Sequence, residues 1–586
     1  MSQPTIAPAT APVAKRAELT TAQALVRLLK ASGVTDWFGV AGGMFARILG
    51  EVSKDPELRY VGTRHEACGG MMAAATFAGT GRLAACIGEM SPGSINLLSG
   101  LGNAYNNNLS LLAITTSPPR ERAHPFRGMF MEWNGREAFR PYTKHSEQVG
   151  DVARVPEVVR GALREALIGR PGPVHVDLPA DVAMGSGEFD LDELDAPIER
   201  FLPTRRPVGD AGDVAEAARL LAAAERPLLI AGGGVIRSGA TDAFRAVAQR
   251  ADAVATATQM GLGAVDSTAP EFIGHGGVIG GPAVMRAMRE ADVVLAVGCR
   301  WSSWMWQAGS IPAVDGRSQR LIQVDIDPSM VGRRQPVSVP IAGDARAVLE
   351  QLLDAFADTE PGRNVDPEWR ASLVEEYGAY LSEHDRLATQ DLEIMHPARV
   401  GKEIGSWLGG DGVAVYDGGH TTFWSNDLTP ATEPATRFHD PGQAQLGFGL
   451  PWALALKLQH PDKPVLDITG DGSLGFTIQE LDTARRYGLN VIVVVHDNEG
   501  FGIVREQQRG LDYELGATLQ GTDYVAIAQA FGCHAERVTR PEEIAPALDR
   551  SLASGRPAVV DVRTFFEYHP SILQFRATSS PPPRPR

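Results

Sequence analysis

The chain has 586 residues, of which 44% are hydrophobic, so it is too long for one core and suits three or four packed domains. Its formal net charge of −16 counts against a role on nucleic acid or on an anionic membrane surface. No stretch approaches the length of a membrane span, and the N-terminus lacks the apolar run of a signal peptide. The cysteines lack CxxC spacing, which fits a reducing cytoplasm better than a disulfide framework or a zinc site; they are Cys68, Cys86, Cys299 and Cys533.

The first α/β domain is expected over residues 18–185, after a disordered leader over residues 1–17. A predicted amphipathic helix at 22–31 is followed by a strand at 37–40, and alternation of this kind predicts a doubly wound parallel sheet. Further on, Glu66 opens a helix of small residues. This carboxylate is either functional or simply stabilised by the N-terminal dipole of its helix.

The middle of the chain predicts a second α/β domain, over residues 206–356, after an acidic linker at 186–200. Its segment 226–239 is a predicted strand that enters a triple-glycine turn, which by itself is weak evidence for a nucleotide. A charged, helix-rich connector at 357–395 leads to a third domain at 396–565. The tail that follows, 566–586, either closes over a substrate or stays disordered, and its Pro-rich end favours disorder.

The third domain contains the most informative stretch, from Val465 to Gly502. An apolar strand enters the turn Gly470-Asp471-Gly472, where glycines allow close approach to a ligand. The capping-box spacing of Thr477 and Glu480 predicts one helix after this turn. The β-branched run at 491–495 then predicts a strand buried on both faces of a parallel sheet.

Two oxygen-bearing side chains follow these two strands. Asp471 comes after the first and Asn498 after the second, 498 − 471 = 27 residues later. Because the carboxyl ends of parallel strands meet at one edge, the two side chains are expected to lie close together. Such ligands beside a glycine-lined loop suit Mg²⁺ carrying a diphosphate. A lone Gly-Asp-Gly is only a turn, but the complete strand–loop–helix–strand unit favours the functional interpretation.

This stretch resembles the thiamin-diphosphate (ThDP) fingerprint, in which a Gly-Asp-Gly is followed by a pair such as Asp497-Asn498. The segment 498–508, NEGFGIVREQQ, is most similar in sequence to the acetolactate synthase large subunit and its relatives. The resemblance implies three doubly wound parallel-sheet α/β domains, which are pyrimidine-binding, central and diphosphate-binding. It also implies that Asp471, Asn498 and the Gly500 carbonyl bind Mg²⁺.

Other residues resemble the family at the positions that hold the cofactor. Arg-His-Glu before a small-residue helix resembles its pyrimidine-binding domain, which implies that Glu66 contacts the aminopyrimidine ring and is the catalytic residue. The stretch 444–457 resembles GxMGFGLPAA, which implies that Leu446 supports the bent cofactor, although simple core packing is the alternative. The remaining cofactor-binding residues implied by the resemblance are Pro92, Asn96, Gly419, His420, Thr421, Gly470, Gly472 and Ser473.

Three departures from acetolactate synthases count against assigning that activity outright. Glu89 and Met90 stand in the loop that usually reads TSGPG, Met131 stands at the catalytic Gln position, and Trp301–Trp304 replaces FDDR. The last change counts against FAD, and the resemblance leaves open whether the central domain holds FAD, ADP or nothing. The residues expected to shape substrate choice are Glu89, Met90, Met131, Trp133, Phe501 and Glu506.

The resemblance thus implies a cytoplasmic ThDP- and Mg²⁺-dependent carbon–carbon lyase or carboligase that acts on a 2-oxo acid or a similar carbonyl donor. A homodimer or homotetramer with active sites shared between subunits is expected, with small-molecule carbonyl substrates as the other partners. One alternative is a 2-hydroxyacyl-CoA lyase or an oxalyl-CoA-type decarboxylase, which the segment 300–310 resembles. Another is a non-catalytic subunit of the same fold.

Overall fold

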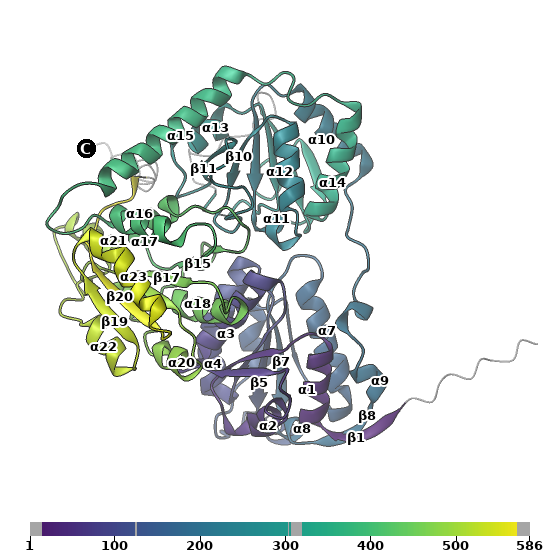
Figure 1. Cartoon of the computed structure of the whole chain (residues 1–586). Coiled ribbons are helices and arrows are strands. Elements are labelled where there is room, and N and C mark those ends of the chain that lie inside the picture. Colours follow the sequence, from purple (N-terminus) through teal and green to yellow (C-terminus); the bar gives the residue numbers. More distant parts are fainter. Residues whose placement is uncertain (1–14, 124–125, 303, 306–318, 571–586) are drawn as a thin grey trace, which may run out of the picture.

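Three α/β domains, each built on a six-stranded parallel sheet, form the molecule (Figure 1). The computed structural model describes residues 15–123, 126–302, 304–305 and 319–570, without the side chains of Asp358 and Thr421. Most of the expected leader and tail, and part of the segment 300–310, therefore lie outside the described residues. The doubly wound parallel sheets predicted from the sequence are confirmed in all three domains.

The first domain has the strand order β3-β2-β4-β5-β7-β6. Its first helix begins where Thr20 and Gln23 form a reciprocal capping box. The strands are β2 (Asp36–Gly39), β3 (Arg59–Gly62), β4 (Ala85–Gly88), β5 (Leu112–Ser117), β6 (His145–Gln148) and β7 (Val174–Pro179). The helices are α1 (Thr21–Ala31), α2 (Ala46–Val52), α3 (Glu66–Thr80), α4 (Met90–Asn107), α5 (Arg120–Ala123), α6 (Gly135–Phe139), α7 (Val155–Leu167) and α8 (Ala180–Ala183).

The segment 186–200, expected to be a linker, is an ordered part of this domain. Its strand β8 (Ser186–Asp190) pairs antiparallel with β1 (Arg16–Thr20), which starts two residues inside the expected leader. The short helix α9 (Leu191–Leu194) follows, and Leu194 and Ile198 are buried in the first core. The sequence did not predict this ordered structure, because the segment is rich in acidic residues and the apolar residues that anchor it are few and widely spaced.

The central domain has the strand order β11-β10-β9-β12-β13-β14. Its triple glycine is explained by packing, since a side chain at Gly232 or Gly234 would collide with the backbone of Gly298 at the end of the neighbouring strand. The strands are β9 (Pro227–Ala231), β10 (Val254–Ala257), β11 (Phe272–His275), β12 (Val293–Val297), β13 (Arg320–Asp325) and β14 (Val339–Ala342). The helices are α10 (Ala211–Ala223), α11 (Gly233–Arg237), α12 (Thr241–Arg250), α13 (Pro282–Glu290) and α14 (Ala345–Ala355).

The long helix α15 (Pro367–Ala388) connects the central domain to the third, whose strand order is β16-β15-β17-β18-β20-β19. The strands of the third domain are β15 (Val413–Tyr416), β16 (Arg437–His439), β17 (Val465–Gly470), β18 (Ile492–Asp497), β19 (His534–Val538) and β20 (Ala558–Arg563). Its helices are α16 (Pro397–Leu408), α17 (His420–Leu428), α18 (Gly449–Gln459), α19 (Asp471–Leu474), α20 (Glu480–Arg486), α21 (Gly502–Arg509), α22 (Tyr524–Ala530) and α23 (Ile544–Ala553).

The single helix predicted after Gly-Asp-Gly is wrong in its details. The chain forms the short α19, then a series of turns, then α20 with Gln479 as its N-cap residue. Thr477 does not cap this helix, because its hydroxyl donates to the Gly447 carbonyl, 2.8 Å away. The Glu480 carboxylate accepts hydrogen bonds from the first domain instead. Tertiary contacts thus use both residues that the spacing assigned to a local cap.

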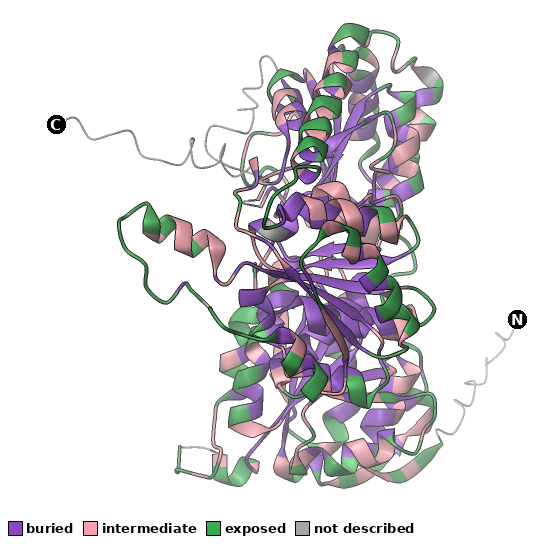
Figure 2. Ribbon diagram, turned by 60° about the vertical axis from the view of Figure 1, so that its left-hand side comes forward, coloured by how far each residue is buried: buried purple, intermediate pink, exposed green. Residues whose placement is uncertain are grey.

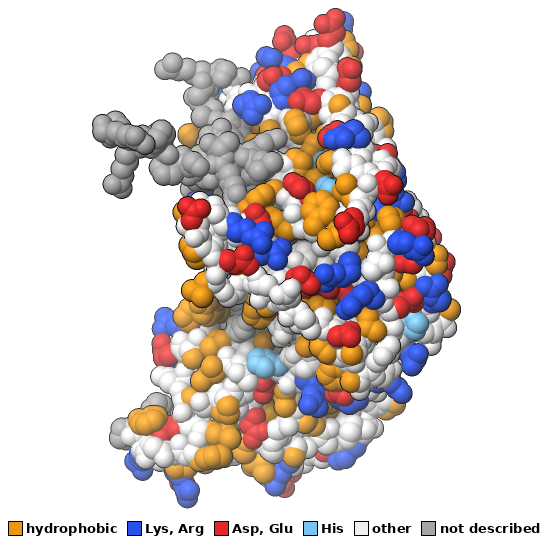
Figure 3. Space-filling model, turned by 90° about the vertical axis from the view of Figure 1, so that its left-hand side faces the viewer, with side chains coloured by type: hydrophobic (Ala, Val, Ile, Leu, Met, Phe, Trp, Pro, Cys, Tyr) orange, Lys and Arg blue, Asp and Glu red, His pale blue; other side chains and the backbone are white. Residues whose placement is uncertain are grey.

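The first and third domains share one continuous apolar core. Helix α3 packs on α18, so closely that a side chain at Gly79 would lie 2.8 Å from Leu456. Most strands inside the three parallel sheets are buried, whereas the outer helical faces are exposed (Figure 2). Acidic and basic side chains are interspersed with apolar ones over the face shown in Figure 3. Among the described residues, no helix is both long and apolar enough to cross a membrane.

Candidate functional site

Asp471 lies at the carboxyl edge of the third sheet, directly after β17. Its side chain is 2% exposed, and its two oxygens accept hydrogen bonds from Gly472 N, at 2.7 Å, and Gly500 N, at 2.8 Å. Strands β17 and β18 pair in parallel register, with Gly470 opposite His496. This register brings the two loops together, so the expected approach of the two strand ends is what the structure has.

Asn498 supplies a second buried oxygen in the loop after β18. Its side chain is 9% exposed, and Oδ1 has no hydrogen-bond partner in the described part of the chain. The neighbouring Asp497 forms an ion pair with Arg563, and the guanidinium lies 2.5 Å from the Asp497 carboxylate. Of the Asp-Asn pair, Asn498 is thus the residue left to bind a ligand.

The electrostatics of this loop suit a cation. Burial raises the pKa of Asp471 to about 7, an effect that the hydrogen bonds from Gly472 and Gly500 oppose. A desolvated carboxyl beside an unpartnered amide oxygen is a pair of hard oxygen donors, the type of ligand that Mg²⁺ prefers. The residues present therefore fit a magnesium ion.

Leu446 lies in a loop that the same domain holds tightly. The next residue, Gly447, donates its N–H to Asp417, at 3.3 Å, and to the Ser473 hydroxyl, at 2.9 Å. Ser473 in turn donates to Asp417, at 2.6 Å. The Ser473 side chain therefore fixes the loop of Leu446 from inside the protein.

Asp417 and Asp467 form a buried acidic pair that the sequence analysis missed. Asp467 is 1% exposed, and neither of its carboxylate oxygens has a hydrogen-bond partner in the described structure. Burial raises the pKa of Asp417 to about 6, and burial together with the nearby Asp417 raises the pKa of Asp467 well above its usual range. Asp417 follows β15 just as Asp471 follows β17, a signal that could have revealed it, whereas Asp467 lies inside a strand.

Close packing defines the rest of this edge. The Phe501 ring covers Gly472, where a side chain would lie 2.7 Å from a ring carbon. Gly419 is the N-cap residue of α17 and contacts Ile503. The buried ring of His420 accepts a hydrogen bond from the backbone N–H of His569, at 3.0 Å. The Thr421 side chain lies outside the described structure.

Glu66 belongs to a second cluster, at the edge of the first sheet. It is the first residue of α3, and its carboxylate accepts a hydrogen bond from Asn96 on α4, at 3.0 Å. A side chain at Gly93 would lie 3.0 Å from the other carboxylate oxygen, and Pro92 beside it is exposed. Glu66 and Asp471 lie on different domains, and no described hydrogen bond joins them.

Glu480 connects the third domain to the loop that carries Glu66, and sequence reasoning gave it only the role of a helix cap. It is fully buried and accepts hydrogen bonds from the backbone N–H groups of Arg64, at 3.0 Å, and His65, at 3.1 Å. The hydroxyl of Thr483 donates to it as well, at 2.6 Å. Only the docking of the two domains reveals this contact.

Two of the candidate substrate residues meet at Thr116, at the end of β5. The Met90 N–H donates to the Thr116 hydroxyl, and the Trp133 indole donates to its carbonyl. Glu89 turns its carboxylate onto the loop at Gly42 and accepts the Met44 N–H, at 3.2 Å.

The other three candidates are not joined to this group by a described hydrogen bond. Met131 has a φ of 55°, in the left-handed region that side chains seldom adopt. Phe501 and Glu506 lie in the third domain, where Glu506 pairs with Arg509 at 2.9 Å. The structure thus separates the six candidates into two domains.

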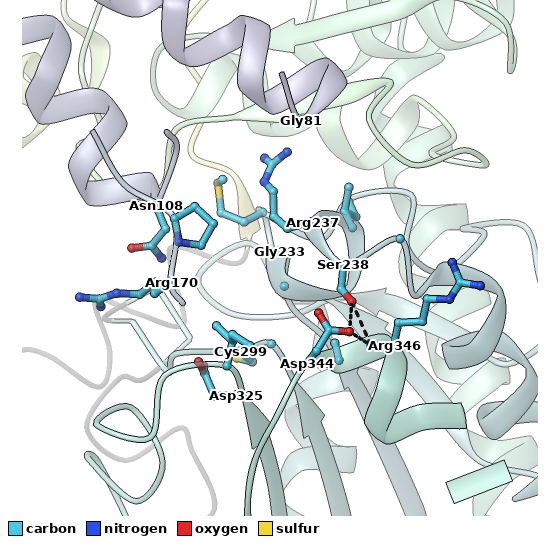
Figure 4. Close-up of a pocket in the computed structure, with 18 of the residues that line it drawn as sticks. Gly81, Asn108, Arg170, Gly233, Arg237, Ser238, Cys299, Asp325, Asp344 and Arg346 are labelled. Carbon is cyan, nitrogen blue, oxygen red and sulfur yellow. Dashed lines mark hydrogen bonds between the residues drawn. The ribbon is translucent and has the colours of Figure 1, made fainter. Parts of the chain in front are cut away.

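A cavity of about 1130 Å³ opens between the central domain and its neighbours (Figure 4). Gly233 and the Arg237 side chain lie on one wall, and Arg170 of the first domain lies on another. Ser238, Asp344 and the backbone of Arg346 form a hydrogen-bonded group at its rim. Burial lowers the pKa of Arg237 to about 10.

Three parallel-sheet domains, with the Glu66 carboxylate on the first and the Asp471 loop on the third, place this chain in the class of three-domain α/β proteins. The chain matches three protein-family models. They are the N-terminal thiamine pyrophosphate (TPP) binding domain at residues 19–138, the central domain of thiamine pyrophosphate enzymes at 214–352, and the C-terminal TPP binding domain at 417–562. The chain belongs to the thiamine pyrophosphate enzyme family, so the alternative of a non-catalytic subunit is not supported.

Similar proteins cover almost the whole chain. A probable acetolactate synthase large subunit from Methanocaldococcus jannaschii is 31% identical over 92% of this chain and 91% of its own length. The acetolactate synthase large subunit of Corynebacterium glutamicum is 30% identical over 93% and 86%, respectively. Acetolactate synthase isozyme 2 large subunit from Escherichia coli K12 is 29% identical over 92% and 95%. The predicted resemblance to acetolactate synthases is confirmed.

Proposed function

We propose that this enzyme is a ThDP- and Mg²⁺-dependent carboligase or lyase that acts on a 2-oxo acid. The observation that carries the proposal is the pair of Asp471, desolvated at the end of β17, and the unpartnered Oδ1 of Asn498 at the end of β18. The similarity to acetolactate synthase large subunits supports a 2-oxo acid as donor.

Each cluster has a distinct role in this proposal. Bound ThDP supplies an electron sink for the carbanion that decarboxylation or carbon–carbon cleavage leaves. Asp471, Asn498 and the Gly500 carbonyl would hold Mg²⁺, which would supply positive charge for the diphosphate of the cofactor. Glu66 exchanges a proton with the aminopyrimidine nitrogen, and Asn96 orients its carboxylate. Leu446, on its fixed loop, would support the cofactor rings.

The donor and the product are tested by supplying pyruvate to the enzyme with Mg²⁺ and ThDP. We expect pyruvate to be consumed and an acetohydroxy acid to form, only when both cofactors are present. Asp471→Asn is expected to abolish turnover, and Asp462→Asn, at an exposed position, is the matched control. Retention of full activity by Asp471→Asn at limiting Mg²⁺ would contradict the assignment of the metal site.

The alternative reaction is cleavage or decarboxylation of an acyl-CoA. The resemblance of segment 300–310 to acyl-CoA lyases and decarboxylases supports it, and the Glu89 carboxylate, which accepts the Met44 N–H, is a departure from the usual TSGPG loop of the synthases. A CoA thioester that raises the melting temperature and is turned over, with pyruvate ignored, would establish this alternative.

For the central cavity we propose an anionic nucleotide as ligand. Its size, the backbone exposed at Gly233 and the guanidinium group of Arg170 support a phosphorylated ligand such as ADP or FAD, whereas the Arg237 guanidinium already donates to the Phe77 and Ala78 carbonyls. Acid release followed by assay distinguishes the two, because FAD is yellow and ADP is colourless.

We also propose a homodimer or homotetramer in which Glu66 of one subunit faces Asp471 of another. The placement of the two clusters on different domains supports this, as does the apolar side chain of Ile95 on α4, which is 54% exposed. A fully active monomer seen by light scattering during assay would contradict it. The four buried free thiols support the cytoplasm as its compartment.

A further inference from the structure

Three side chains from distant parts of the chain meet at the junction of α15, α17 and the segment after β20. They are His384 on α15, Asp427 on α17 and His569 near the end of the described chain. Helix α15 runs alongside α16 and α17 here (Figure 1). The exposed side-chain fractions are 1% for His384, 5% for Asp427 and 0% for His569. Water therefore has little access to the cluster.

A hydrogen bond to the backbone determines which ring nitrogen of His384 carries the proton. His384 Nδ1 lies 2.9 Å from the Tyr380 carbonyl, and because a carbonyl oxygen only accepts, Nδ1 is the nitrogen that carries hydrogen. The neutral ring then directs the lone pair of Nε2 toward Asp427 and His569. A metal-bound histidine is commonly oriented by such a contact from its other nitrogen.

The distances among the three ligand atoms fit one ion. His384 Nε2 and His569 Nε2 are 3.3 Å apart, and the same Asp427 oxygen lies 3.3 Å from His569 Nε2 and 3.7 Å from His384 Nε2. A tetrahedral zinc site with bonds of about 2.0–2.1 Å has ligands about 3.3–3.4 Å apart. An octahedral site with similar bonds would need about 3.0 Å between neighbouring ligands. The observed distances match the tetrahedral arrangement better.

The charge of the cluster also favours a cation. Asp427 is a buried carboxylate, and its described partners are the two histidines and the Tyr380 hydroxyl, which donates to it at 2.7 Å. Neither lysine nor arginine pairs with it in the described part of the chain. A buried carboxylate without a permanent positive partner is costly, and a divalent ion removes that cost.

We propose that His384, Asp427 and His569 bind one divalent transition-metal ion, with Zn²⁺ as the preferred ion and water in the fourth position. This site is distinct from the oxygen-only site at Asp471, because two imidazoles select a transition metal over Mg²⁺. The ion would fasten the segment after β20 to the connector helix and to α17. It would thereby hold the His569 N–H against His420, at the start of α17.

The test is a cobalt titration of the full-length protein, because tetrahedral Co²⁺ absorbs visible light strongly and needs no turnover to be seen. Metal is removed with a chelator, and Mg²⁺ and ThDP are then added in excess so that the Asp471 site is filled. We expect one Co²⁺ per chain with the intense spectrum of tetrahedral coordination, displaced by Zn²⁺. Wild-type protein that takes up no Co²⁺ under these conditions overturns the proposal.

Variants assign the ion to these ligands. We expect His384→Gln and His569→Gln each to lower Co²⁺ affinity at least about 100-fold, while His460→Gln, at a half-buried histidine outside the cluster, binds as wild type does. Circular dichroism checks that each variant is folded. Zn²⁺ is also expected to raise the melting temperature of wild type but not of His569→Gln. Equal binding by all three variants would overturn the assignment, whatever the enzyme's reaction is.

Discussion

The Glu480 carboxylate accepts a hydrogen bond from the backbone N–H of His65, 3.1 Å away, one residue before Glu66. A fully buried acid of the third domain therefore holds the loop that carries the candidate catalytic acid of the first. Neutralising it with Glu480→Gln weakens the two backbone hydrogen bonds. We expect a loss of about 1–3 kcal/mol in the free energy of unfolding.

The same variant should lower kcat more than it changes ThDP affinity, because Glu480 positions the loop of Glu66 without touching the metal loop. Thermal unfolding and steady-state kinetics measure the two effects, and Glu368→Gln, at an exposed glutamate, is the control. Unchanged stability together with unchanged kcat would show that the contact is dispensable.

Glu66→Gln tests the activation step directly. The amide still fits beside Asn96 but cannot exchange a proton, so we expect kcat to fall about 10²- to 10⁴-fold with ThDP still bound. Glu57→Gln, at a surface glutamate whose side chain is 70% exposed, is expected to keep wild-type activity. Full turnover by Glu66→Gln would refute the catalytic role.

The pKa of Asp471 predicts how Mg²⁺ binding depends on pH. Because this pKa is about 7, the metal-free protein holds a proton on Asp471 below that pH, and Mg²⁺ must displace it. We expect the apparent Mg²⁺ affinity to fall about tenfold for each pH unit below about 7 and to level off above it. Calorimetry with ThDP present measures this, and an affinity independent of pH between 5.5 and 7 would contradict it.

The buried pair of Asp417 and Asp467 predicts a stability that falls as pH rises. Both pKa values are raised above the unfolded value of 3.8, so the folded protein binds more protons than the unfolded one. The contribution of this pair to the free energy of unfolding is fully present below about pH 4. It is lost as the pH rises through the pKa of Asp417, near 6, and beyond.

Asp467→Asn removes one of these titrating groups. We expect the free energy of unfolding at pH 8 to rise by about 1–3 kcal/mol, because a neutral amide replaces an unpartnered buried carboxyl, and the gain should shrink toward pH 5. Denaturant unfolding at both pH values measures it. A variant less stable than wild type at pH 8 would show that Asp467 has a partner that outweighs its burial.

The sequence by itself determined the three parallel sheets and the approach of the loops that carry Asp471 and Asn498 at one sheet edge. Both follow from local rules, since alternating strands and helices fix the sheet type and parallel strands bring their carboxyl ends to one edge. The family also followed from short motifs, because a glycine turn and its following residues are contiguous in the chain.

Only the tertiary structure decided which other residues join these elements. Glu480 and Thr477 have the spacing of a helix cap, yet each bonds a distant backbone group instead. His384, Asp427 and His569 are far apart in sequence, and the packing of α15 and α17 against the segment after β20 brings them together. Local patterns predict the elements because neighbours along the chain fix backbone geometry, whereas contacts between domains depend on how whole surfaces dock, which no local pattern records.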